Sequence, residues 1–264
     1  MKILVCISKS PDTTSKIAFS DQNTKFDENG VQYIVNPYDE WYALVRALEI
    51  KEANGGSVTI ITVGTAVDDP VIRKALAIGA DSAVRIDAEP SEAYFTATQI
   101  SAYAKDQSFD LVLLGKETIN YNGSQVGGML AQQLDLPFVS VVSKLDVNDN
   151  VATVENEVPG GVEVSELSLP AVVSCAKGVA EQRIPNMRGI MAARTKPLNV
   201  VAPVECEPLT SFVSYELPNE KSACKMIDPE NMDEYVFLYF SEFQLESPTW
   251  DNMTIYDGED TNAP

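Results

Sequence analysis

The stretch with the clearest chemical potential is the glycine- and asparagine-rich run at residues 115–127, which separates an apolar strand-like segment from a helical one. Such a loop offers several backbone N–H groups and the positive end of a helix, and Ser124 and Gln125 can also donate from their side chains. These groups can hold a phosphate with little formal positive charge. The residue order is neither that of a P-loop nor that of a GxGxxG fingerprint. A plain glycine-rich turn between a strand and a helix explains the spacing equally well.

Three other short segments could meet this loop. They are Cys6-Ile7-Ser8 after the first strand, Asn36-Pro37-Tyr38-Asp39 at the start of a helix, and Val63-Gly64 after a later strand. Ligands of open α/β sheets bind outside the carboxyl ends of the strands, where the strand order reverses. We therefore expect the four segments to converge. Asn36 also suits a helix N-cap and Pro37 the first helical position, so this segment taken alone is better explained as a plain helix start.

The residues needed for most acid–base chemistry are missing. The chain has no histidine, which excludes Ser–His and Cys–His pairs and imidazole acids or bases. Four cysteines stand far apart with no CxxC pair, so a metal site is not expected, and Cys6 and Cys175 are predicted to be buried in strands. No carboxylate pair and no activated nucleophile stands out. The sequence predicts binding rather than catalysis.

The net charge is unevenly distributed. The formal charge of -20 argues against nucleic acid or an anionic membrane as the main partner. Fourteen acidic residues and two lysines lie in residues 205–264, whereas residues 177–196 hold five basic residues and one acid. The chain starts directly with a strand-like segment, and no apolar run approaches the ~20 residues that span a bilayer. We expect a cytoplasmic protein.

The first 200 residues alternate short apolar strands with helical patterns. Strands are predicted at residues 2–7, 57–63, 83–86, 110–114, 138–145 and 171–175, and helices at 36–53, 70–78, 91–105 and 125–134. Residues 17–34 are predicted to form a hairpin with its turn at 27–30, and residues 151–167 another. This alternation of strands and helices predicts an α/β fold whose mostly parallel sheet is covered by helices on both faces.

Five ordered motifs resemble the beta subunit of electron-transfer flavoprotein. They are NPYDEWYALVRALEIKE, VTIITVGTAVDDPVIRKALAIGADSA, DLVLLGKETINYNGSQVGGMLA, VENEVPGGVEVSELSLPAVVSC and RIPNMRGIMAARTKPL. The resemblance is collinear over about residues 1–200 and continues weakly to about 235. It implies a sheet of the adenine-nucleotide alpha-hydrolase-like (Rossmann-like) type with a β-hairpin insertion. It further implies a nucleotide-binding domain at 1–200, an extended C-terminal arm at 201–243 packing on an alpha subunit, and an acidic, loosely ordered tail at 244–264.

The resemblance also implies a function. Members form a heterodimer whose alpha subunit holds FAD, and they carry electrons from acyl-CoA-type dehydrogenases to a quinone reductase or another acceptor. The beta subunit has no catalytic residues of its own and binds AMP, or a second FAD in electron-bifurcating members, in one cleft. The residues implied to contact the nucleotide are Cys6, Asn36, Pro37, Tyr38, Asp39, Val63, Asn122, Gly123, Ser124, Gln125, Val126 and Gly127.

The basic segment at 177–196 corresponds to the family's recognition loop, which docks into the partner dehydrogenase. Met187 occupies the place of the apolar anchor, flanked by Arg183 and Arg188. The alternative is that Met187 packs into the domain and the arginines are simply solvated. Residues 120–123 replace an acidic run common in relatives, which leaves AMP and a second FAD both open. A non-redox adenine-nucleotide-binding regulator, similar to universal stress proteins, is the remaining alternative.

Overall fold

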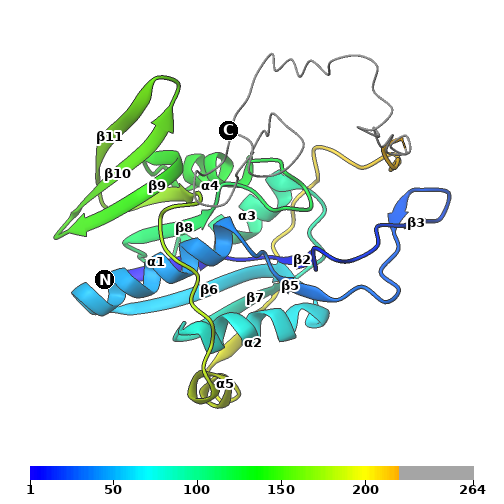
Figure 1. The fold of residues 1–264 in the computed structure, drawn as a ribbon, viewed down its shortest axis with the longest axis horizontal. Coiled ribbons are helices and arrows are strands. Elements are labelled where there is room, and N and C mark those ends of the chain that lie inside the picture. The colour runs from blue at the N-terminus through cyan, green and yellow to red at the C-terminus, as the bar shows by residue number, and fades with distance from the viewer. Residues whose placement is uncertain (220–264) are drawn as a thin grey trace, which may run out of the picture. The chain divides into compact units, whose positions relative to one another are not determined.

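The apolar strands of the sequence form one nine-stranded sheet in the computed structural model, which describes residues 1–219. The strand order is β11-β10-β9-β12-β8-β1-β6-β7-β13 (Figure 1). The strands from β9 to β13 in this order are parallel, whereas β10 is antiparallel to both of its neighbours. Their bounds are β1 Lys2–Cys6, β6 Ser57–Gly64, β7 Ser82–Asp87, β8 Leu111–Gly115, β9 Phe138–Asn148, β10 Val151–Val158, β11 Gly161–Ser168, β12 Ala171–Cys175 and β13 Leu198–Val201.

Helices cover both faces of the sheet. The helices α1 (Asp39–Asn54) and α2 (Asp69–Ile78) pack on one face, and α3 (Ala93–Ala104) and α4 (Val126–Leu134) pack on the other (Figure 1). Successive strand residues point to opposite faces. Strand β1 therefore sends Ile3 and Val5 into the apolar cluster under α1 and α2, and Leu4 and Cys6 into the cluster under α3 and α4. The prediction of a mostly parallel, helix-covered sheet is confirmed.

The strand order reverses at β1. From β1 the chain passes through α1, β6 and α2 to β7, and then α3 returns it to β8 on the other side of β1. Connections that leave neighbouring strands in opposite directions open a crevice outside the carboxyl ends of those strands. The crevice of this protein is therefore expected between the ends of β1 and β8.

The N-terminal hairpin differs from the prediction. The short strands β3 (Phe19–Ser20) and β4 (Lys25–Phe26) pair with each other, and β2 (Lys9–Pro11) pairs with β5 (Tyr33–Val35). The placement of the hairpin turn at residues 27–30 is wrong. The chain reverses at residues 21–23 instead, where three polar residues take left-handed φ angles of 49°, 58° and 64°. Residues 28–31 form a separate turn that leads into β5.

The start of α1 also differs. Its N-cap is Tyr38 and its first residue is Asp39, so the assignment of Asn36 as N-cap and Pro37 as first helical residue is wrong. The side chain of Asn36 is instead turned toward the loop after β8, where its amide donates to the carbonyl of Glu117 at 3.1 Å. Asp39 and Glu40 occupy the first turn, and Gly55 ends the helix.

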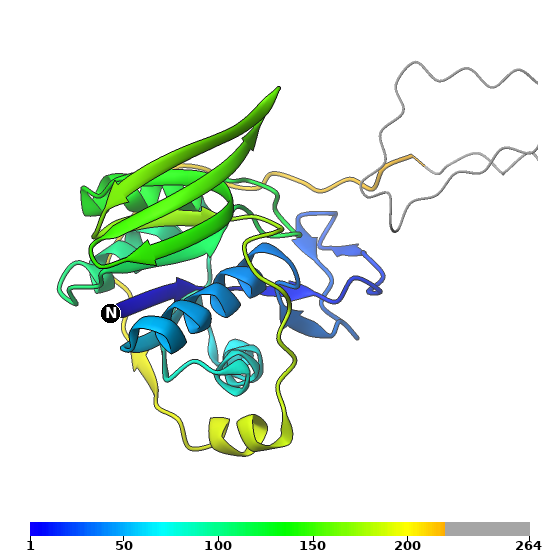
Figure 2. The same ribbon diagram turned by 60° about the vertical axis from the view of Figure 1, so that its left-hand side comes forward.

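Two shorter helices complete the described chain. The 3-10 helix η1 (Ala66–Asp68) precedes α2, and α5 (Met187–Ala193) packs against α2 within the basic segment 177–196 (Figure 1). Strands β9, β10 and β11 form a long antiparallel ribbon at one edge of the sheet (Figure 2).

The described chain ends within the predicted C-terminal arm. Residues 202–219 contain no helix or strand, and the predicted arm beyond 219 and the tail at 244–264 lie outside the described residues. No helix of the described part is long and apolar enough to cross a bilayer.

Candidate functional site

The four predicted segments converge at the carboxyl ends of β1, β6 and β8. The closest approach is at Gly115, the last residue of β8, which lies against the start of α1. A Cβ atom at Gly115 would stand 2.9 Å from the backbone N of Glu40 and 3.0 Å from Cβ of Asp39. Only a residue without a side chain allows this contact. The end of β8 and the first turn of α1 therefore form one wall of the crevice.

Asn36 joins this wall to the loop after β8. Its side chain is 1% exposed, and its Nδ2 donates to the carbonyl of Glu117. Its Oδ1 is buried and has no hydrogen-bond partner among residues 1–219. An unpaired buried acceptor is unfavourable unless a ligand or water supplies a donor. Asn36 therefore offers the crevice a fixed acceptor.

Glu40 joins α1 to the end of β1. Its carboxyl group accepts a hydrogen bond from the backbone N of Ser8 at 2.7 Å and from Ser8 Oγ at 2.9 Å. Burial raises the pKa of Glu40 to about 8, although the hydrogen bonds from Ser8 act in the opposite direction. Burial also raises the pKa of the neighbouring Asp39. The raised pKa of Glu40 reduces the negative charge of this wall near neutral pH, which favours an anionic ligand.

The end of β6 is held by a residue that the sequence analysis missed. Asp68 accepts from the backbone N of Thr65 at 2.8 Å, and its other oxygen lies 3.1 Å from Nζ of Lys9. The spacing Thr65-x-x-Asp68 resembles a capping box and could have pointed to it. Val63, which precedes this turn, is buried, as is Cys6 at the end of β1. Burial raises the pKa of the Cys6 thiol far above its usual range, so Cys6 packs as a neutral side chain.

The loop after β8 has the backbone expected of a ligand-binding turn. Asn122 and Ser124 both take left-handed φ angles of 49°, and Gln125 is the N-cap of α4. The first helical residues, Val126 and Gly127, begin a turn whose N–H groups have no acceptor within the helix. Ser124 Oγ donates to Glu117 Oε2 at 3.2 Å, and Gly123 has open space around its Cα. The loop can therefore direct backbone donors toward a bound anion.

Pro37 and Tyr38 lie at the outer side of the crevice. The carbonyl of Pro37 accepts from Nε2 of Gln182 at 2.6 Å, which connects the crevice to the basic segment 177–196. Tyr38 is half-exposed. All twelve predicted nucleotide-contact residues thus lie on the converging segments, and the additional residues Ser8, Glu40, Asp68 and Glu117 support them.

The basic segment is anchored on α1 and α2. Arg183 pairs with Glu52 through two contacts of 2.6 and 3.1 Å, and its carbonyl accepts from Nε1 of Trp41 at 3.3 Å. A Cβ at Gly189 would stand 2.3 Å from the carbonyl oxygen of Ala77, so α5 lies very close to α2. The backbone of the segment is therefore held firmly on the domain.

Part of this segment faces away from the domain, whereas Lys196 donates from Nζ to the carbonyls of Leu76 and Ala80. Met187 is 74% exposed and Arg188 is exposed, so Met187 does not pack into the core. Arg183 differs from Arg188, because its guanidinium is already held by Glu52 of the same chain. The segment thus presents an apolar side chain and an exposed arginine on an anchored backbone.

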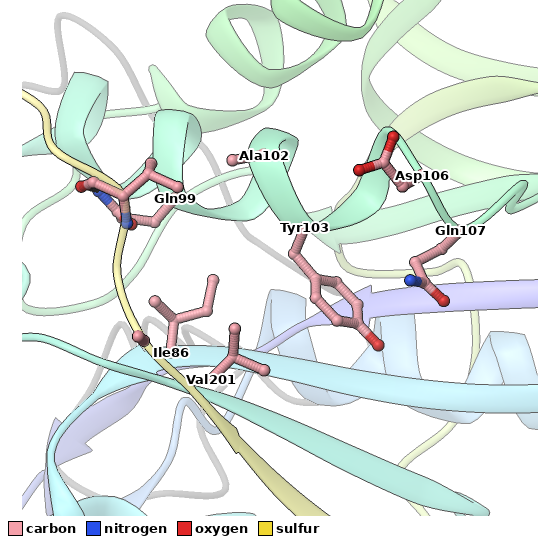
Figure 3. Close-up of a pocket in the computed structure, with 9 residues that line it drawn as sticks. Ile86, Gln99, Ala102, Tyr103, Asp106, Gln107 and Val201 are labelled. Carbon is pink, nitrogen blue, oxygen red and sulfur yellow. Dashed lines mark hydrogen bonds between the residues drawn. The ribbon is translucent and has the colours of Figure 1, made fainter.

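A separate hollow of about 200 Å³ lies between α3 and the strands β7 and β13. Figure 3 shows Tyr103 of α3 above Ile86 and Val201 of the two strands. None of the predicted nucleotide-contact residues lines it. It is therefore distinct from the crevice at β1 and β8.

The fold defines an α/β protein whose mostly parallel sheet reverses its strand order at β1, the place where such sheets bind ligands. The sequence model of the electron transfer flavoprotein domain matches residues 23–205. The chain is 34% identical over 259 residues to the electron transfer flavoprotein subunit beta of Bacillus subtilis (strain 168), covering 93% of this chain and 100% of that protein. It therefore belongs to the family of electron transfer flavoprotein beta subunits.

Two further relatives extend this comparison. The human electron transfer flavoprotein subunit beta is 31% identical over 233 residues, which cover 84% of this chain and 91% of that protein. CarD, a subunit of the caffeyl-CoA reductase-Etf complex of Acetobacterium woodii, is 31% identical over 250 residues, which cover 89% of this chain and 94% of that protein. Family membership supports an electron-transfer role.

Proposed function

We propose that this chain is the beta subunit of a heterodimeric electron-transfer flavoprotein and that its crevice binds AMP as a structural nucleotide. The observation that carries the proposal is the buried Oδ1 of Asn36, which has no partner within residues 1–219 and lies among the strand ends that converge at the reversal point of the sheet. The N–H groups at the start of α4 favour a phosphate, and the raised pKa of Glu40 limits repulsion. The fold is accordingly of the adenine-nucleotide alpha-hydrolase-like (Rossmann-like) type.

The flavin of the alpha subunit would supply the redox chemistry, and this chain would supply binding and geometry. Electrons would come from an acyl-CoA-type dehydrogenase and leave to a quinone reductase or another acceptor in the cytoplasm. We assign dehydrogenase docking to the recognition loop at 177–196. Its anchored backbone and the exposed Met187 and Arg188 are the features expected of a docking site. The C-terminal arm would pack on the alpha subunit.

A second FAD in the same crevice is the alternative, because one relative belongs to a caffeyl-CoA reductase-Etf complex. Both ligands share an adenosine phosphate portion. Copurification with the alpha subunit, followed by denaturation and quantification of AMP and flavin, separates the two. One flavin and one AMP per heterodimer is the expected result, and two flavins without AMP would favour the alternative. Release of neither AMP nor a second flavin would contradict nucleotide binding by this chain.

A further inference from the structure

Residues 209–215, here called the strap, run along the carboxyl edge of the sheet between two anchored ends. At one end, the carboxylate of Glu92 at the start of α3 accepts from the backbone N of Leu209 at 2.8 Å and from Thr210 Oγ1 at 2.9 Å. At the other end, the backbone N of Tyr215 donates to the carbonyl of Asn23 in the β3–β4 turn at 2.7 Å. The strap therefore passes from the α3 side of the sheet to the N-terminal hairpin.

A column of four aromatic rings fixes the strap to the loop after β8. Tyr121 stacks on Phe212 with ring centroids 6.0 Å apart, Phe212 stacks on Tyr215 at 5.4 Å, and Tyr215 stacks on Phe19 at 5.0 Å. The interplanar angles are 28°, 22° and 14° respectively, so all three contacts are offset stacks rather than edge contacts. The column joins the loop, the strap and the hairpin through side chains far apart in sequence.

Tyr121 directly precedes the residues assigned to the nucleotide. The neighbouring backbone is held by local bonds, from the N of Asn122 to the carbonyl of Thr118 at 2.8 Å and from Ser124 Oγ to Glu117. Asn122 and Ser124 take left-handed angles, which non-glycine residues adopt only when their surroundings favour them. Stacking of Phe212 on Tyr121 supplies such a contact from outside the loop.

We propose that the strap and the nucleotide-binding loop are thermodynamically coupled through the Tyr121–Phe212 stack. When the strap is stacked on Tyr121, it holds residues 122–127 in the nucleotide-binding conformation. Bound nucleotide in turn favours the stacked strap, because coupling between two sites is reciprocal. The inference rests on the proposed nucleotide site. It adds a means by which the first part of the C-terminal arm senses nucleotide occupancy.

The test is titration of AMP into nucleotide-free heterodimer carrying wild-type chain, Phe212→Ala or Val213→Ala. Val213 is the matched control, because it neighbours Phe212 and is 81% exposed. Loss of stacking is expected to weaken AMP binding roughly three- to tenfold in Phe212→Ala. Binding by Val213→Ala is expected to equal that of the wild type. For each variant, the melting temperature with AMP is compared with that of the same variant without nucleotide. This difference separates a loss of AMP affinity from a loss of stability.

Limited proteolysis provides the reciprocal measurement. AMP is expected to slow cleavage within residues 209–215 of the wild type, and to slow it less in Phe212→Ala. Equal AMP affinity and equal protection in Phe212→Ala and wild type would overturn the coupling while leaving the nucleotide site intact. Failure of the wild-type heterodimer to bind AMP would overturn both proposals.

Discussion

Ser8 and Glu40 form a buried junction in which both the backbone N–H and the hydroxyl of Ser8 donate to one carboxyl group, at 2.7 and 2.9 Å. Ser8 follows β1, and Glu40 lies in the first turn of α1. The junction therefore fixes the distance between the two elements that border the crevice. It also places a buried ionisable group beside the proposed nucleotide.

This junction predicts a pH dependence of stability. Burial raises the pKa of Glu40 from 4.5 to about 8, so between these values the unfolded chain ionises Glu40 while the folded chain retains its proton. The stability that the protonated form contributes is therefore lost as pH rises through this window. Glu40→Gln removes this titration. As pH rises, the free energy of unfolding of Glu40→Gln should therefore increase relative to that of the wild type, by up to about 1.4 kcal/mol per pH unit. Chemical denaturation of the heterodimer at about pH 5 to 8 measures this difference.

Glu52→Gln is the control for the pH experiment. The hydrogen bond from Arg183 lowers the pKa of Glu52, so its titration lies below the window. The stability difference between Glu52→Gln and the wild type should stay constant as pH rises. A constant difference for Glu40→Gln as well would show that Glu40 is ionised in the folded protein.

Asn36→Ala should lose both a structural contact and the proposed ligand acceptor. The side chain bridges to Glu117 through Nδ2, and its Oδ1 faces no partner in the described chain. The loss of this bridge leaves the buried Glu117 carbonyl unpaired and should destabilise the protein by about 1–3 kcal/mol. The AMP content of the purified heterodimer should fall in parallel. Asn29→Ala removes only an exposed contact to Asp27 and should retain full nucleotide content, and the same content in Asn36→Ala would contradict the assignment.

Gly115→Ala should disturb the crevice wall directly. The added Cβ would stand 2.9 Å from the backbone N of Glu40, which cannot move without shifting α1. We expect a loss of about 1–3 kcal/mol of stability, measured by denaturation of the heterodimer. Gly128→Ala in α4 is the matched control, because its Cβ would meet nothing closer than 3.7 Å, and it should be neutral or stabilising by up to about 1 kcal/mol. Equal effects of the two substitutions would argue against the close contact between Gly115 and the start of α1.

Met187→Ala and Arg188→Glu should weaken electron acceptance from the dehydrogenase without affecting assembly with the alpha subunit. Both side chains are exposed on the anchored segment, and truncation of an interface anchor typically weakens binding roughly tenfold or more. The rate of flavin reduction against dehydrogenase concentration provides the measurement. Val164→Ala, an exposed apolar residue on β11, is the control and should behave as the wild type. Unchanged rates in both test variants would place the docking site elsewhere.

The sequence by itself predicted most strands of the sheet and the helices α1 to α4, but neither β13 nor α5. Apolar periodicity and glycine positions are local signals, so they closely predicted α2, β6 and the C-terminal end of α1. The rule that ligands bind at strand ends selected the four segments that the structure brings together. The basic segment was also recognisable, because clustered charge is visible without a structure.

Only the tertiary structure decided what each side chain contacts. Asn36 looks like a helix cap in sequence but donates to Glu117, which lies 81 residues away. Arg183 looks like a free docking residue but pairs with Glu52, 131 residues away. The stack of Tyr121 on Phe212 has no local signature at all. The periodicity of side chains along the sequence reveals local secondary structure. The partners of a side chain depend instead on which distant elements the packed core brings within a few ångströms.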